Sequence, residues 1–170
     1  MPVVFTVEDG SNVADANSYG AVVDADQYHL NRGNATWAAL SETVKQQSLI
    51  KATDYLDQRF GDRFIGERTN ETQVLEWPRE YAGDFDDDVI PTKLQYACFE
   101  YALRASTVVL APDPVVSDSG VTMVTTKQKA GPVEQSFYAV GGGTVQLLRA
   151  YPTADMYLRE LVETNNRVIR

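Results

Sequence analysis

The chain has 170 residues, of which 44% are hydrophobic and 23% are charged, a composition that predicts one globular domain over residues 1–170. Its 24 acidic and 15 basic residues give a net charge of −9. A protein that grips nucleic acid normally carries a basic patch, so this balance disfavours nucleic-acid binding as the main task. The sequence has no apolar run of about eighteen residues, so we expect no membrane-spanning helix. The acidic N-terminus predicts no secretory signal, and the single Cys98 predicts no internal disulfide, which suits synthesis in a reducing cytoplasm.

The first 22 residues are expected to form an N-terminal arm, with a β-prone run over residues 3–7 and a turn-rich loop over residues 10–20. A helical core is then expected over residues 23–110. Asp24 and Gln27 form a capping-box-like pair, which predicts a short helix over residues 25–32. A further helical turn is expected over residues 36–40.

Two longer segments carry apolar residues at spacings of three and four, the pattern of an amphipathic helix. The first covers residues 42–60, with Ser41 as its N-cap and Gly61 at its end. The second covers residues 91–110, with Pro91 at the first helical position. We expect these helices to pack together as the core pair. The apolar positions of the second helix are Leu94, Ala97, Cys98, Tyr101, Ala105 and Val108.

Residues 62–90 form a long excursion between these helices, with at most a turn of helix near residues 71–75. A loop of this length inside a small domain is typical of a segment that contacts a partner. Trp77, Pro78 and Arg79 are expected to be its structural anchor, because Trp77 can bury a large apolar area. The Arg79 guanidinium is expected to reach Asp54 or Asp57.

The last third of the chain is predicted to contain a linker, a hairpin and a terminal helix. Residues 121–140 predict a β-hairpin around Gly131–Pro132, with strands over residues 121–129 and 133–140. Residues 144–170 are expected to hold a short amphipathic helix over residues 153–163 and a polar tail.

The acidic run before the second long helix partly copies a calcium-binding loop. Asp84, Asp86 and Asp88 occupy the first three ligand positions of an EF-hand. Val89 stands where that loop needs glycine, and Gln95 stands where it needs a bidentate glutamate. A solvated acidic loop is therefore the better interpretation, and no metal is expected.

The other reactive side chains suggest no reaction centre or cofactor. His29 is the only histidine, so no imidazole cluster can hold zinc, and no serine lies in a nucleophile-elbow motif. Residues 141–143 are three glycines without the lysine of a phosphate-binding loop. Lys127 and Lys129 are a weak basic pair on a predicted strand. We expect no catalytic residue and no cofactor, and hence a protein that is not an enzyme.

Several short motifs, in this order and spacing, resemble the tailed-phage head–tail adaptor (connector) proteins, a family catalogued as DnaT-like single-stranded-DNA-binding proteins. The resemblance covers nearly the whole chain. No single motif decides it. The residues that carry it are Val7–Glu8–Asp9–Gly10, Ala16–Asn17–Ser18–Tyr19, Tyr28–His29, Arg32–Gly33–Asn34, Trp37, Ala52–Thr53–Asp54–Tyr55–Leu56–Asp57, Leu75, Trp77–Pro78–Arg79, Glu100–Tyr101–Ala102–Leu103, Gly131–Pro132–Val133, Tyr151–Pro152 and Asp155.

The resemblance implies a mainly α fold, a bundle of about four to five helices with a β-hairpin arm and an extended C-terminal segment. It implies a structural part of the virion neck, made in the host cytoplasm. Adaptors of this kind form a homo-oligomeric ring of about twelve copies beneath the portal protein. The ring joins the DNA-filled head to a downstream neck or tail-completion protein, and the genome passes through its lumen without specific binding.

Two sets of candidate interface residues follow from this interpretation. A DNA channel works better if its wall weakly repels phosphates, so acidic side chains of residues 80–88 or of the N-terminal arm are expected near the lumen. The candidates are Asp84, Asp86, Asp87 and Asp88. The candidate contacts with the portal or a neighbouring subunit are Tyr157, Arg159, Arg167 and Arg170.

Two alternatives remain open at this point. The first is a single-stranded-DNA-binding module, for which nine tyrosines could stack on bases although the net charge is unfavourable. The second is a small hydrolase or metalloenzyme, which lacks a set of reactive residues. Retardation of single-stranded DNA in a gel at moderate salt would favour the first alternative.

Overall fold

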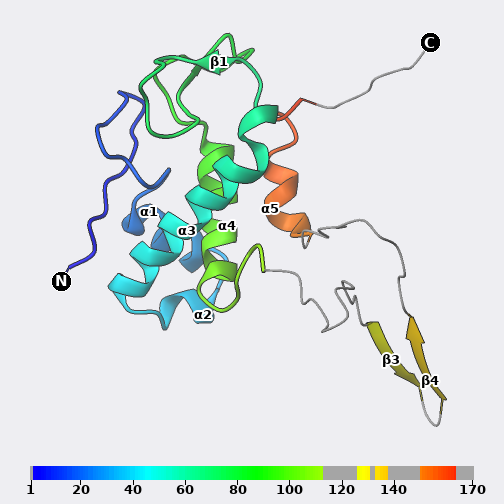
Figure 1. Ribbon diagram of the computed structural model, residues 1–170. Coiled ribbons are helices and arrows are strands. Elements are labelled where there is room, and N and C mark those ends of the chain that lie inside the picture. The colour runs from blue at the N-terminus through cyan, green and yellow to red at the C-terminus, as the bar shows by residue number, and fades with distance from the viewer. Residues whose placement is uncertain (1, 113–125, 131–132, 138–149, 164–170) are drawn as a thin grey trace, which may run out of the picture. The chain divides into compact units, whose positions relative to one another are not determined.

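The computed structural model of the chain describes residues 2–112, 126–130, 133–137 and 150–163 (Figure 1). The chain divides into two units, one of residues 1–110 with 150–170 and the other of residues 111–149. The described elements are mainly helical with two short antiparallel strand pairs, which confirms the expected fold class. Within the described ranges, no helix combines the length and the apolar character that crossing a membrane requires.

The helical unit is built on the packing of α3 (Glu42–Phe60) against α4 (Thr92–Ala105), as predicted for the core pair. The α3 helix has the predicted bounds, and the Ser41 side chain accepts a hydrogen bond from the backbone N–H of Val44 at 3.4 Å. The residues that make the contact are fully buried, and the Tyr55 and Tyr101 rings lie 5.0 Å apart. From α3 these residues include Leu49, Ala52 and Leu56, and from α4 Leu94, Ala97 and Cys98.

The α4 helix is shorter than predicted at both ends. Pro91 is its N-cap in an extended conformation, with ψ at 131°, rather than its first helical residue. The helix stops at Ala105, and Val108 is 40% exposed instead of facing the core. Ser106 and Thr107 donate side-chain hydrogen bonds back to backbone carbonyls three residues earlier, which competes with helical bonding. The β-branched run that follows is also a weak helix former.

Two short helices cover one end of the core pair. The α1 helix (Val22–Leu30) starts earlier than the capping-box pattern predicted, because its N-cap is Ala21 and Asp24 lies inside the first turn. The chain is held just before this start, where a Cβ on Gly20 would lie 2.5 Å from the Phe99 ring. The α2 helix (Ala35–Ala38) corresponds to the helical turn expected over residues 36–40, is capped by Asn34 and buries Trp37.

Three short elements at the excursion were not predicted from the sequence, and the helical turn expected near residues 71–75 is absent from it. A short 3₁₀ helix, η1 (Gly61–Arg63), continues α3. Strands β1 (Glu67–Arg68) and β2 (Arg79–Glu80) pair antiparallel. Residues 71–75 form turns rather than helix. A strand is predicted from polar and apolar residues that alternate over four or more positions. These strands have only two residues each, so the sequence shows no such pattern.

The C-terminal elements follow the prediction in type but not in length. The α5 helix (Pro152–Tyr157) packs on α4 and ends six residues earlier than expected, because residues 158–162 turn back to form a bridge between Phe64 and Val162. In the other unit, β3 (Thr126–Ala130) pairs antiparallel with β4 (Val133–Phe137), which confirms the hairpin. The N-terminal arm makes a single bridge, between Val7 and Ser18, instead of a strand ladder.

Candidate functional site

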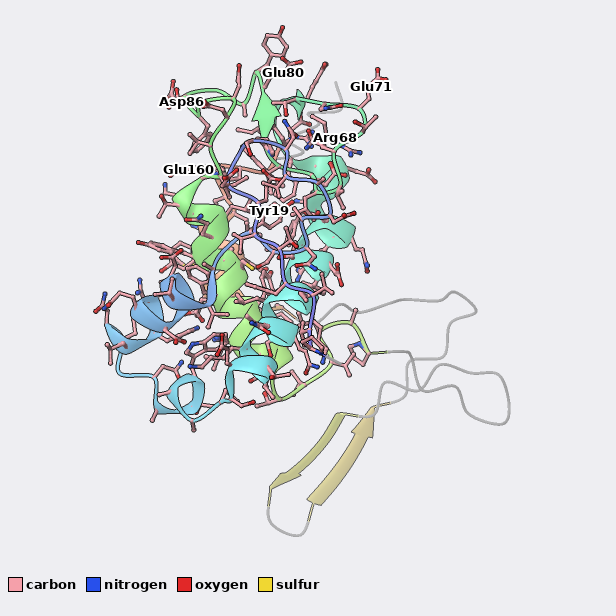
Figure 2. The ribbon with its side chains drawn as sticks, turned by 90° about the vertical axis from the view of Figure 1, so that its left-hand side faces the viewer. Tyr19, Arg68, Glu71, Glu80, Asp86 and Glu160 are labelled. Carbon is pink, nitrogen blue, oxygen red and sulfur yellow. The ribbon has the colours of Figure 1, made fainter. Side chains whose placement is uncertain are left out.

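The excursion lies at one end of the helical unit, where side chains of Glu71, Glu80 and Asp86 project from it (Figure 2). Between residues 62 and 88 the sequence holds nine acidic residues and three arginines. Two of these arginines, Arg68 and Arg79, form ion pairs with Glu76 at 3.9 and 2.9 Å. The excursion is therefore a strongly acidic surface, and two of its three arginines form ion pairs within it. We call residues 62–88 the acidic excursion.

All four candidate lumen residues are exposed on this surface. Asp84, Asp86, Asp87 and Asp88 follow one another in the loop that leads into α4. Among the described residues no group of three or more His, Cys, Asp or Glu side chains is placed to hold a metal ion. The exposed aspartates thus provide a negative surface potential over the start of α4.

The N-terminal arm lies directly against this acidic loop. Gly10 has a φ of +105°, and a Cβ added there would lie 1.9 Å from the backbone oxygen of Asp88. The buried Glu8 carboxylate shapes the arm, because it accepts hydrogen bonds from the backbone N–H groups of Gly10, Asn12 and Val13 at 2.9–3.0 Å. The two segments that the sequence named as alternative sources of lumen charge are therefore neighbours.

The centre of the excursion is held by Trp77, Pro78 and Arg79, all of which are buried. The Trp77 ring lies 5.9 Å from Phe64 and 6.1 Å from Phe85, both in edge-to-face contact. The peptide bond between Trp77 and Pro78 is cis. These contacts join the excursion to the hydrophobic core of the helical unit, of which Trp77 and Phe64 are members.

The expected partner of Arg79 was wrong. Its guanidinium donates to the carbonyls of Ile65 and Gly66 at 3.0 and 2.8 Å and pairs with Glu76, not with Asp54 or Asp57. Glu76 is only three residues away in the same loop, so the pair forms without the excursion having to fold onto α3. The Asp57 oxygens are already engaged by other donors.

Asp57 on α3 binds both the N-terminal arm and the excursion, through a tyrosine hydroxyl of the first and a backbone N–H of the second. Its carboxylate accepts hydrogen bonds from the Tyr19 hydroxyl and, at 3.1 Å, from the Glu76 N–H. The Tyr19 oxygen in turn accepts from the N–H groups of Glu76 and Trp77 at 3.1 and 3.3 Å. Figure 2 shows Tyr19 inside the unit, among the helices. Burial raises the pKa of Asp57 to about 7 and raises the pKa of Tyr19 well above its ordinary value.

Of the four candidate contacts with the portal or a neighbouring subunit, the structure describes two, Tyr157 and Arg159. Tyr157 is half-buried at the end of α5, its hydroxyl 3.2 Å from that of Tyr28, and Arg159 is exposed. Arg167 and Arg170 lie outside the described residues. Arg32 stacks its guanidinium over the Tyr28 ring at 3.5 Å and lies 5.5 Å from the Tyr96 ring. This corner is where described tyrosines and an exposed arginine come together.

Six of the described lysine and arginine side chains form ion pairs with carboxylates within the helical unit. Beside Arg68 and Arg79, four further side chains form ion pairs: Lys45 with Asp26, Arg59 with Asp155, Lys93 with Glu160 and Arg104 with Glu100. A groove that tracks a phosphate backbone needs several cations free to face it. The described surface does not bring unpaired cations together in that way.

Among the interior polar groups, His29 was predicted from the sequence to be half-buried on a short helix, whereas no role was assigned to Glu100. Glu100 is buried on α4 and accepts a hydrogen bond from the Tyr28 hydroxyl at 3.0 Å as well as pairing with Arg104. Arg104 is four residues from Glu100 on the same helix, so the sequence could have indicated this ion pair. Tyr28 lies on α1, so its contact with Glu100 could not be predicted from spacing. His29 is buried too, and burial lowers its pKa.

A comparison with protein-family models gives a match over residues 3–170. The chain belongs to the family described as "Putative DnaT-like ssDNA binding protein". This confirms the family part of the resemblance drawn from the sequence. The description names single-stranded DNA, which was the alternative function considered there, and it names no part of a virion. No curated protein and no solved structure matches the chain.

Proposed function

We propose that the chain is a structural protein of the phage neck, a head–tail adaptor that assembles as a ring beneath the portal protein. In this role it works by fitting against copies of itself, the portal and a downstream neck protein, and no chemical reaction is involved. The motif order described above supports the phage assignment. The mainly helical unit with a separate hairpin unit is consistent with it.

The observation that carries the proposal is the distribution of charge. Nine carboxylates against three arginines make the acidic excursion negative, and four aspartates are exposed in succession beside the N-terminal arm. Elsewhere in the helical unit, ion pairs with carboxylates hold Lys45, Arg59, Lys93 and Arg104. A surface of this kind repels phosphates, which suits the wall of a channel through which DNA must slide without sticking.

The direct test is to mix the protein with its portal ring and to image the product by electron microscopy. We expect a ring of this chain on the portal, with residues 84–88 or the N-terminal arm facing the central channel. A lumen lined by lysine and arginine would refute the channel role of the acidic residues. If phage particles made without the protein still joined heads to tails and kept their genomes, the adaptor function itself would be refuted.

The family description supports a second candidate, binding of single-stranded DNA. The described corner best suited to it contains Arg32, Tyr96 and Tyr157, because stacked bases need aromatic rings and a nearby cation. Fluorescence anisotropy with a labelled oligothymidine at moderate salt tests this candidate. Saturable binding that is lost in Arg32→Glu but kept in Lys51→Glu, an equal charge change on an exposed residue of α3, would favour it. The adaptor proposal predicts that neither the wild type nor either variant binds.

A further inference from the structure

The N-terminal arm runs along the outside of the helical unit and is hydrogen-bonded along only one of its two edges (Figure 1). The Thr6 N–H donates to the Asn17 side chain at 2.9 Å, and the Thr6 carbonyl accepts from the Asn17 N–H at 2.9 Å. The Val4 carbonyl accepts from the Asn17 side chain at 3.0 Å, and the Glu8 N–H donates to the Ser18 carbonyl at 2.8 Å. The backbone groups of residues 4, 6 and 8 therefore face the loop that follows the arm.

The residues between them direct their backbone groups to the opposite edge. In an extended chain the N–H and C=O groups of successive residues point to alternate sides. Val3, Phe5 and Val7 therefore face away from the loop. Within the described part of the chain, no hydrogen bond uses the backbone groups of these three residues. We call this unpaired side of residues 3–7 the free edge.

The free edge lacks the features by which proteins usually prevent a further strand from pairing. Such edges are normally protected by charged residues, by proline, by a bulge or by a covering segment. Residues 3–7 are Val, Val, Phe, Thr and Val, with no charge and no proline. Phe5 packs against the core, whereas Val4 is 74% exposed. The arm is thus anchored and open to a strand that adds through main-chain hydrogen bonds.

The hairpin has unpaired edges of its own. Among the described residues, β3 and β4 pair only with each other, so each strand has one edge without a neighbour. A two-stranded hairpin is marginally stable in water, and a third strand is needed for independent stability. The β3 strand has five residues, which matches the five residues of the free edge.

Charge favours β3 over β4 as the strand that pairs with the arm. The sequence of β3 contains Lys127 and Lys129 and no acidic residue, whereas that of β4 contains Glu134. Residues 1–26 hold five acidic residues and no lysine or arginine. Opposite charges favour the encounter of these two segments, although two copies of the whole chain, each with a net charge of −9, repel each other.

We propose that β3 of one copy pairs with the free edge of the next copy, so that the arm and the hairpin form a three-stranded sheet between subunits. The inference rests on the ring assembly proposed above, and it names the segments through which neighbouring subunits touch. Each copy accepts a strand at its arm and donates a strand from its hairpin. The two segments differ, so the contact is heterologous, the kind that closes into rings.

Photo-cross-linking between two forms of the full-length chain tests this contact. One form carries benzoylphenylalanine in place of Gln128, in the middle of β3, and the other is labelled with nitrogen-15. The mixture is irradiated at high protein concentration, alone and on the portal ring. We expect a product of twice the 18.9 kDa chain mass, in which mass spectrometry finds position 128 linked to labelled residues 2–9.

Two proline variants of the labelled form show whether the backbone edge makes the contact. Val3→Pro removes an N–H group from the free edge, whereas Val4→Pro removes one that faces the loop and has no partner among the described residues. Val3→Pro should lower the yield of the link about three- to ten-fold, because one hydrogen bond is lost. Val4→Pro should leave the yield within about two-fold. Far-UV circular dichroism of both variants should match the wild type, because neither residue lies in a helix.

The strand contact would be overturned if position 128 formed no link to a labelled arm in either sample, or linked only to the portal or to its own chain. Equal yields from the two proline variants would also overturn it. Portal imaging separates this inference from the proposed function. Rings on the portal without the arm link would reject the strand contact and leave the adaptor role intact. The arm link in a protein that never binds the portal would reject the adaptor role alone.

Discussion

At the scale of single residues, the fold depends on partly buried polar groups that join distant segments of the chain by hydrogen bonds. Asp57 is such a group, since it receives hydrogen bonds from an N-terminal tyrosine and from the backbone of the acidic excursion. Its charged form is disfavoured by burial, and this raises its pKa to about 7 from an ordinary value of 3.8. The folded chain therefore holds a proton on Asp57 at pH values where the unfolded chain has released it.

The pH dependence of stability should reveal this proton. Between about pH 4 and pH 7 the native state binds more protons at Asp57, so the free energy of unfolding should fall as pH rises, by at most about 1.4 kcal/mol per pH unit. In Asp57→Asn this contribution to the slope should vanish, whereas Asp86→Asn, at an exposed site, should keep the wild-type slope. Urea unfolding at several pH values measures it. Equal slopes for the wild type and Asp57→Asn would contradict the assignment.

Gly10 has no side chain, and this allows the N-terminal arm to pack against the acidic loop at Asp88. Its φ of +105° and the 1.9 Å approach of a Cβ to the Asp88 oxygen exclude any larger residue. Gly33 is the natural control, because its φ is +64° but no atom lies within 4 Å of its Cβ position. Gly10→Ala should cost about 3 kcal/mol or more of unfolding free energy, and Gly33→Ala about 1–2 kcal/mol. Chemical denaturation of both variants distinguishes steric conflict from backbone strain, and similar losses would show that the Asp88 contact can relax.

At the scale of elements, the helices are joined by polar networks as well as by apolar packing. Glu100 on α4 accepts from Tyr28 on α1, and Tyr28 contacts the Tyr157 hydroxyl on α5. Arg104, one turn along α4, neutralises the same carboxylate. Burial and the neighbouring Glu100 charge raise the pKa of Tyr28, so its hydroxyl stays protonated and remains a donor. Three helices thus meet at one buried glutamate.

Removing Glu100 should be far more costly than removing an exposed acid in a similar pair. Glu100→Ala leaves Arg104 without its carboxylate and Tyr28 without its acceptor, so we expect a loss of about 2–3 kcal/mol. Glu160 pairs with Lys93 but has a side chain that is 65% exposed, so Glu160→Ala should cost less than about 1 kcal/mol. Thermal and urea unfolding of the two variants provide the measurement. Equal effects would mean that the buried network adds little to helix docking.

At the scale of the whole molecule, the chain separates a helical unit from residues 111–149. The described strands of the second unit, β3 and β4, pair with each other in a two-stranded hairpin. A lone two-stranded hairpin is marginally stable in water, so a partner surface would stabilise this unit. In the proposed ring, neighbouring subunits and the portal would supply such surfaces.

The helical unit should therefore fold without the second unit. Replacing residues 111–149 by a Gly–Ser linker should preserve the helical circular dichroism and leave the thermal midpoint within about 5 °C of the wild type. The same replacement of residues 67–80 removes the buried Trp77 and should abolish cooperative unfolding. Loss of cooperative unfolding on deleting residues 111–149 would show that the two units fold together.

Elements that carry a strong local signal could be predicted from the amino-acid sequence. The three-and-four spacing and the Ser41 cap predicted α3 to the residue, because helix periodicity and capping are properties of neighbouring residues. The hairpin was predicted from Gly131–Pro132 between two β-prone runs, and the family from the order of short motifs. The exposed positions of Asp84–Asp88 agree with their reading as a solvated loop.

Only the tertiary structure decided which distant groups meet. Arg79 was expected to reach Asp54 or Asp57, yet Asp57 is occupied by Tyr19, which lies 38 positions away in the sequence. The ends of α1, α4 and α5 were also misplaced, because packing at Gly20 and side-chain hydrogen bonds at Ser106 override the local pattern. Local propensity acts over a few residues, whereas burial and pKa shifts arise from segments that only the folded chain brings together.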